Sequence, residues 1–78
     1  MTPPDGELEL RVRELVATCF GAPLDAISRA TVRDDVEGWD SLGQLNLMLA
    51  LEDSFGVRLE IDEMQSLVSV DAIVSFLE

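Results

Sequence analysis

Ser41 is the residue of this 78-residue chain whose position most favours a chemical modification. It follows Asp40, a good N-cap residue, and no proline interrupts the segment from Ser41 to Phe55. At the first position of a helix, free backbone N–H groups and the helix dipole stabilise an attached negative charge such as a phosphate ester. Gly38 and Trp39 allow the preceding chain to turn and present the hydroxyl at a corner. A lone serine there is most often only a helix-start residue, and that interpretation stays open on these grounds.

The residue types that the chain lacks make Ser41 a poor catalytic nucleophile. The sequence contains no His and no Lys, so it cannot form a Ser–His pair, a Schiff base or a His-containing zinc site. Cys19 is the only cysteine and cannot form an intrachain disulfide. Its place on the apolar face of a predicted helix indicates core packing. The chain is therefore not predicted to be an enzyme, and Ser41 is predicted to be modified by another enzyme.

The charge balance excludes two classes of partner. The chain has 16 Asp and Glu residues against five Arg, which gives a formal net charge of -11. Nucleic acids and anionic membranes are bound by clustered basic residues, so neither is expected as a partner. The apolar fraction of 47% is that of a folded globule. Because there is no signal peptide and no apolar run of about 20 residues, we expect a cytoplasmic protein with basic partners.

Hydrophobic periodicity and capping residues predict an all-α fold. The expected helices cover residues 6–20, residues 41–55, a short segment 62–67 capped by Asp62, and a last segment from its cap Ser69 to Leu77. Gly56 is expected to end the second helix, and residues 57–61 to form an extended connection. The prediction is a small four-helix bundle, with three main helices and one short one, in a single domain over residues 6–78. Residues 1–5 are predicted to be a flexible leader.

The connection over residues 21–40 is long for a compact domain, which favours a functional role for it. Its isolated apolar residues Leu24, Ile27 and Val36 are expected to pin it onto the core. One short turn of helix is expected near residues 24–28.

The predicted helix over residues 41–55 is more apolar than one core requires. One arc of its surface holds Leu47, Met48, Leu51 and Phe55, and a second arc holds Leu42, Leu45 and Leu49. Together the arcs span roughly 220°, about twice the width that a surface helix buries. Either the helix is central and buried on two sides, or the second arc contacts a partner protein. The helical wheel alone does not decide between these interpretations.

The segment around Ser41 resembles the acyl carrier protein family. The resemblance is carried by Gly38-Trp39-Asp40-Ser41-Leu42-Gly43, by Leu45 and Leu47, and by the run from Ala50 to Gly56. Within it, the triplet Asp40-Ser41-Leu42 is similar to the family's attachment motif. The resemblance extends over nearly the whole chain, because the helix lengths, the long first connection and the acidity also match.

The resemblance implies a cofactor, a fold and a set of partners. Ser41 would carry a 4′-phosphopantetheine arm, installed by a phosphopantetheinyl transferase from coenzyme A, whose thiol holds an acyl group as a thioester. Acyl-loading and acyl-transferring enzymes with basic docking patches would bind a monomer transiently through its second helix. Their contacts would be Asp40, Leu42, Leu45, Leu49, Glu52 and Asp53, with Asp62, Glu63 and Met64 of the short helix as a second lip that can move to admit an acyl chain.

The departures from the family pattern favour a specialised pathway. Carriers of fatty-acid synthesis usually have acids just after the serine, whereas Gly43, Gln44 and Asn46 are uncharged here. The pattern is more similar to stand-alone carriers of polyketide or hybrid peptide assembly, envelope polysaccharide acylation or small-acid activation.

The same residues suggest two other functions. The first is an unmodified acidic helical module that binds a basic partner. The second is a calcium-binding helix pair, prompted by the acids from Asp34 to Asp40. An EF-hand loop that starts at Asp34 would have Val36 at its third position and Trp39 at its sixth, where an oxygen ligand and a glycine are needed. This pattern therefore excludes the EF-hand.

Overall fold

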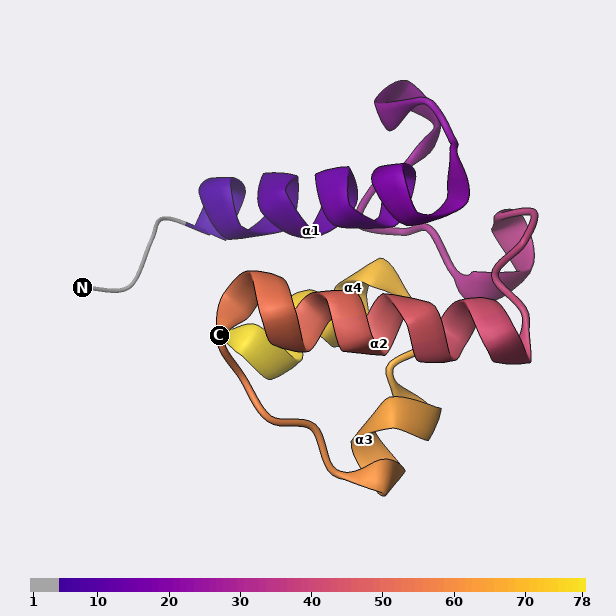
Figure 1. Cartoon of the computed structure of the whole chain (residues 1–78). Coiled ribbons are helices and arrows are strands. Elements are labelled where there is room, and N and C mark those ends of the chain that lie inside the picture. Colours follow the sequence, from indigo (N-terminus) through magenta and orange to yellow (C-terminus); the bar gives the residue numbers. More distant parts are fainter. Residues whose placement is uncertain (1–4) are drawn as a thin grey trace.

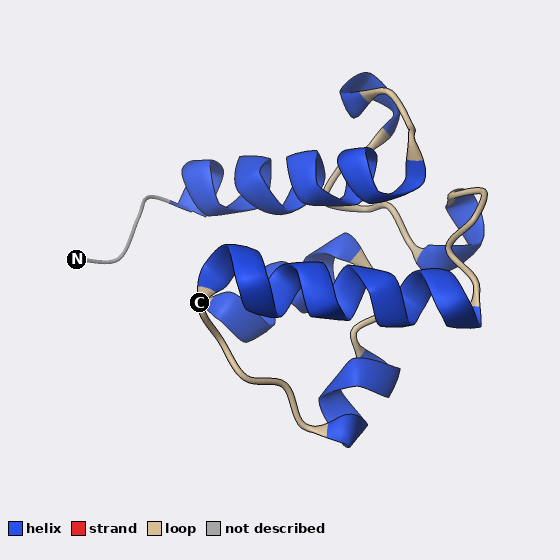
Figure 2. Ribbon diagram, viewed as in Figure 1, coloured by secondary structure: helices blue, strands red, loops and turns tan. Residues whose placement is uncertain are grey.

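The computed structural model describes residues 5–78 as a bundle of helices, which confirms the predicted all-α fold (Figures 1 and 2). Its elements are α1 (Asp5–Phe20), two short 3₁₀ helices η1 (Leu24–Ala26) and η2 (Arg33–Asp35), α2 (Ser41–Phe55), α3 (Ile61–Ser66) and α4 (Val70–Leu77). The predicted leader lies outside the described residues except for Asp5, which begins α1. No helix within residues 5–78 combines the length and the apolar character needed to cross a membrane.

The helices share one core. Helix α1 packs against both α2 and α4, and α3 contacts α2. Figure 1 shows α1 and α2 running in opposite directions, so that the long connection between them and the start of α2 lie at the same end of the molecule. The largest fully buried side chains come from three helices and the connection: Val12, Val16, Ile27, Leu47, Met48, Leu51, Val70, Ile73 and Val74.

Local capping interactions set most helix ends where they were predicted. The Asp40 carboxylate accepts a hydrogen bond from the Gly43 amide at 2.9 Å and begins α2. Gly56 ends α2 in the left-handed conformation, with φ of 65°. The Ser69 hydroxyl accepts a hydrogen bond from the Ala72 amide at 3.0 Å and begins α4. The connection covers residues 57–60 instead of the predicted 57–61, because Ile61 begins the next helix.

The prediction for α3 was wrong by one residue and in its cap. The helix covers Ile61–Ser66 with Glu60 at the N-cap, instead of residues 62–67 with Asp62 as the cap. The Glu63 carboxylate accepts a hydrogen bond from the Glu60 amide at 2.8 Å. A carboxylate three residues into a helix can reach back in this way and satisfy the N-cap amide. This contact moves the helix start to Ile61.

The connection between α1 and α2 is pinned as predicted. Ile27 and Val36 are buried, Leu24 is partly buried against the core, and η1 supplies the expected turn. The second turn, η2, was not predicted. Here the chain is tied to the segment before α4, because the Arg33 amide donates to the Val68 carbonyl at 2.9 Å. The connection is therefore held both by its buried side chains and by this backbone hydrogen bond.

Candidate functional site

Ser41 begins α2 and is exposed to solvent. It lies beside an open groove of about 380 Å³. Residues from α2, α3 and η2 line this groove: Arg33, Ser41, Gln44, Leu45, Ile61, Met64 and Gln65. An exposed hydroxyl next to an open groove of this size fits covalent attachment of an extended organic group.

Buried anchors hold the chain just before Ser41. Trp39 is almost fully buried, and its ring stacks on Phe20 with the ring centroids 5.5 Å apart. Its carbonyl oxygen accepts a hydrogen bond from Nε of Arg33 at 3.0 Å. Gly38, just before it, has φ of 92°, a conformation that side chains disfavour. The turn at Gly38 and the anchor at Trp39 thus place Ser41 at a corner, as the sequence indicated.

Gly43 allows α2 to approach this turn closely. A Cβ atom at Gly43 would overlap the carbonyl oxygen of Gly38 and would lie 2.8 Å from Cε1 of Phe20. The turn that precedes Ser41 therefore packs directly on the backbone of α2. The sequence indicated Gly43 only as part of the family resemblance, because the atoms it packs against come from other parts of the chain.

Gln44 is a buried polar residue that was not predicted to have a structural role. Its side chain is 6% exposed, and its Oε1 accepts a hydrogen bond from Nε1 of Trp39 at 2.6 Å. Its Nε2 donates to the carbonyl oxygens of Met64 at 2.7 Å and Leu67 at 3.0 Å. Gln44 thereby connects α2 to the preceding turn and to α3. Its spacing of three residues from Leu47 was the available signal, because it places a polar side chain on the core face.

Three leucines form an exposed strip on α2. Leu42 is 68% exposed, Leu45 is 47% exposed and Leu49 is 50% exposed. Residues at these spacings lie on one helix face. The interpretation that α2 is buried on two sides is therefore wrong, because residues 5–78 leave this face uncovered. The other apolar arc faces the core, with Leu47, Met48 and Leu51 fully buried and Phe55 partly so.

The predicted acidic contacts have two different surroundings. Asp40, Asp53 and Asp62 are exposed, although the Asp40 carboxylate also caps α2. Glu52 and Glu63 are partly buried, and each carboxylate accepts a hydrogen bond from a backbone amide. The donor to Glu52 is the Leu59 amide, at 2.9 Å, and the donor to Glu63 is the Glu60 amide. Met64 is partly buried and lines the groove beside Ser41.

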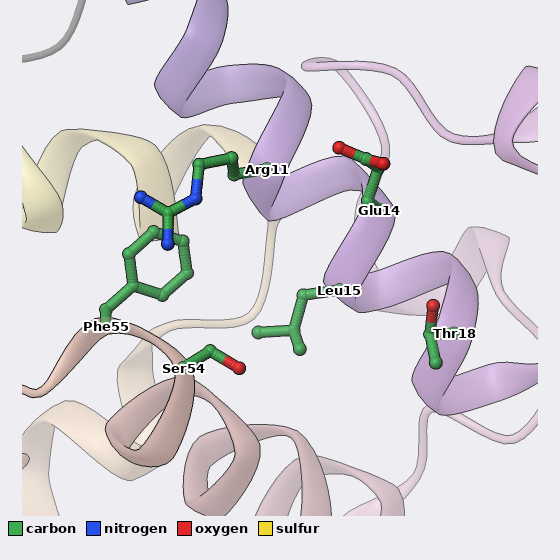
Figure 3. Close-up of a pocket in the computed structure, with 6 residues that line it drawn as sticks. All are labelled: Arg11, Glu14, Leu15, Thr18, Ser54 and Phe55. Atoms are coloured by element: carbon green, nitrogen blue, oxygen red, sulfur yellow. The ribbon is translucent and has the colours of Figure 1, made fainter.

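A second hollow lies between α1 and the far end of α2. Figure 3 shows Arg11 over the ring of Phe55, with 4.5 Å from the guanidinium carbon to the ring centroid. Ser54 lines this hollow, and it follows Ser41 by 13 residues, or about 20 Å of helix. This hollow is therefore separate from the groove beside Ser41.

The lone thiol is unsuited to nucleophilic chemistry. Cys19 is partly buried against the core, which confirms the predicted packing role. Burial raises the pKa of the Cys19 thiol, so the reactive thiolate form is disfavoured.

Comparisons with known proteins agree with this geometry. Residues 10–77 match a family model described as "Phosphopantetheine attachment site". Among similar proteins are the acyl carrier protein of Sinorhizobium fredii (strain NBRC 101917 / NGR234) and the acyl carrier protein AcpP of Rhizobium meliloti (strain 1021). Each is 32% identical to this chain over 68 residues, which cover 87% of both chains.

Proposed function

Because this chain belongs to the acyl carrier protein family, we propose that Ser41 is the residue to which its phosphopantetheine arm is attached. The observation that supports this assignment is the exposed Ser41 hydroxyl at the first position of α2, beside the groove. Backbone amides at a helix start favour the negative charge of a phosphodiester. The carrier domain is proposed to cover residues 6–78.

The arm supplies a thiol that holds an acyl group as a thioester. The chain's own residues hold the attachment point: Asp40 caps the helix, Trp39 anchors the turn, and Gly43 lets the two pack together. The sequence has no His or Lys to activate Ser41 as a nucleophile. The attachment is therefore the work of a separate transferase, and the chain is a carrier rather than a catalyst.

Partner enzymes are proposed to dock on the exposed strip of α2. The strip Leu42, Leu45 and Leu49 supplies apolar contact, and Asp40, Asp53 and Asp62 supply negative charge around it. Exposed charges of this kind mainly speed encounter and choose partners, and add little to affinity. A monomer that docks transiently in the cytoplasm can deliver its acyl group and leave.

The pathway is proposed to be specialised rather than housekeeping fatty-acid synthesis. The support is the uncharged start of α2, where Gly43 and Gln44 are packed into the fold and Asn46 is exposed. Polyketide or hybrid peptide assembly, envelope polysaccharide acylation and small-acid activation are the candidate settings.

The test of the attachment is intact-mass analysis of the purified chain after incubation with coenzyme A and a broad-specificity phosphopantetheinyl transferase. We expect a mass gain of one phosphopantetheine group, and fragmentation should assign it to the peptide that contains Ser41. No gain would favour the unmodified interaction module instead. A gain assigned to any other serine would contradict the proposal for Ser41.

If partners dock on the exposed strip of α2, a substitution in the strip should slow arm transfer without lowering the stability of the fold. Leu42→Ala should lower kcat/KM for arm transfer by roughly tenfold, because a central interface side chain contributes about 1–2 kcal/mol. Its thermal midpoint should stay unchanged, since Leu42 is largely exposed. Leu10→Ala is the matched control, because Leu10 is an exposed leucine on α1. Equal transfer rates for the two variants would argue against docking on α2.

A further inference from the structure

Gln44 lies between the groove beside Ser41 and the hydrophobic core. It lines the groove, yet only 6% of its surface is exposed. Its three hydrogen-bond partners are the Trp39 indole and the carbonyl oxygens of Met64 and Leu67. Trp39 and Leu67 belong to the buried core cluster. A chain that passed from the groove into the core at this point would have to displace Gln44.

We infer that Gln44 closes the core to the acyl group, so that this carrier holds its cargo in the outer groove and is suited to short acyl groups. This inference rests on the proposed attachment at Ser41.

The hydrogen bonds of Gln44 oppose its displacement. Within residues 5–78, every buried side-chain nitrogen and oxygen has a hydrogen-bond partner. Moving Gln44 out would leave the Trp39 N–H and the Leu67 carbonyl without that partner in a buried site, and the Met64 carbonyl without it in a partly buried one. A hydrocarbon chain can neither donate nor accept a hydrogen bond, so it cannot replace the amide.

The same amide restrains α3. The carbonyls of Met64 and Leu67 lie at the end of α3, and both accept from the one Nε2 group of Gln44. Figure 1 shows α3 beside α2, which it contacts. To open the core between these two helices, α3 would have to move away from α2. Such a movement breaks both bonds at once. The inference therefore opposes the expectation that α3 moves to admit an acyl chain, and the experiment below decides between the two.

The open groove itself suits a short cargo. Its lining is mixed: Arg33, Gln44 and Gln65 are polar, and the larger share of the lining is apolar, with Leu45, Ile61 and Met64. Because it is open to solvent, a long hydrocarbon chain that lay in it would stay largely in contact with water. Apolar surface left in water gains no hydrophobic stabilisation.

The test loads the wild-type chain from butanoyl-, octanoyl- and dodecanoyl-coenzyme A with the same transferase. We expect the thermal midpoint to be the same for the three forms within error. The methyl NMR signals of Ile61 and Leu45 should shift on loading, and those of the core residues Leu51 and Ile73 should not. A midpoint that rises with chain length, together with shifts at the core methyls, would overturn the inference.

Variants of the two groove glutamines identify the residue responsible. In Gln44→Ala, the midpoint should rise by several degrees from the butanoyl to the dodecanoyl form, and the core methyls should shift. Gln65→Ala is the matched control, because Gln65 lines the same groove but is exposed, and it should behave as wild type. If Gln44→Ala does not fold, Gln44→Leu keeps the volume without the polar groups and carries the same expectation. A folded Gln44 variant with no chain-length dependence would refute the role of Gln44.

The readouts separate this inference from the proposed function. Failure to load any acyl group would overturn the attachment at Ser41 and the inference with it. Normal loading with core sequestration in wild type would overturn the inference alone.

Discussion

Ser41→Ala is expected to abolish transfer of the phosphopantetheine group to this chain and to leave its fold intact. The variant has no hydroxyl at the proposed attachment position, so the loss should be complete rather than partial. Ser41 is exposed, and Asp40 rather than Ser41 caps α2. The free energy of unfolding should therefore change by no more than about 0.5 kcal/mol.

Intact mass and thermal unfolding measure the two halves of this prediction. Ser54→Ala is the matched control, since Ser54 is also an exposed serine on α2 but lies by the far hollow. The control should gain the full mass of the arm. A mass gain in Ser41→Ala equal to that of wild type would disprove attachment at Ser41. A lowered thermal midpoint in that variant would instead reveal a structural role for the hydroxyl.

Gly43→Ala is expected to destabilise the fold by about 2–3 kcal/mol, the scale of forcing an extra methyl group into a packed site. The added Cβ would overlap the Gly38 carbonyl oxygen, which is backbone and cannot swing aside, and would press on the Phe20 ring. Alanine normally favours a helix over glycine by about 1 kcal/mol, so steric overlap must exceed that gain. For a domain of this size, the thermal midpoint should fall by roughly 10–20 °C.

Gly6→Ala is the matched control for this substitution. Gly6 lies in α1, and a Cβ atom there would meet nothing within 4 Å. That variant should be as stable as wild type or slightly more stable. Because Gly43 also positions the turn before Ser41, Gly43→Ala should slow arm transfer at temperatures where it remains folded. An unchanged midpoint for Gly43→Ala would contradict the close packing of α2 on Gly38.

The helix ends were predictable because each depends on residues close in sequence. The Asp40 and Ser69 caps act across three residues, and Gly56 ends α2 through its own backbone conformation. The start of α3 was wrong by one residue because several neighbouring acids can cap a helix. Which acid reaches back to an N-cap amide depends on the local backbone path, and here it is Glu63.

The roles of Gly43 and Gln44 could not be predicted in the same way. Gln44 bonds to carbonyls 20 and 23 residues further along the chain. Gly43 packs against Phe20, in the last turn of α1. These pairs meet only after α1, the connection and α3 have packed on α2, so helical periodicity does not predict them.

By itself, the sequence determined the all-α fold, the acidic surface, the absence of His and Lys and the family motif around Ser41, since these follow from composition and from residues close together in the chain. It also showed that α2 has two apolar arcs, because periodicity reports which residues share a face. Periodicity does not report which face another helix covers. Only the tertiary structure decided that Leu42, Leu45 and Leu49 stay exposed, and that Gln44 lies between the groove and the core, because both depend on where α1, α3 and α4 pack.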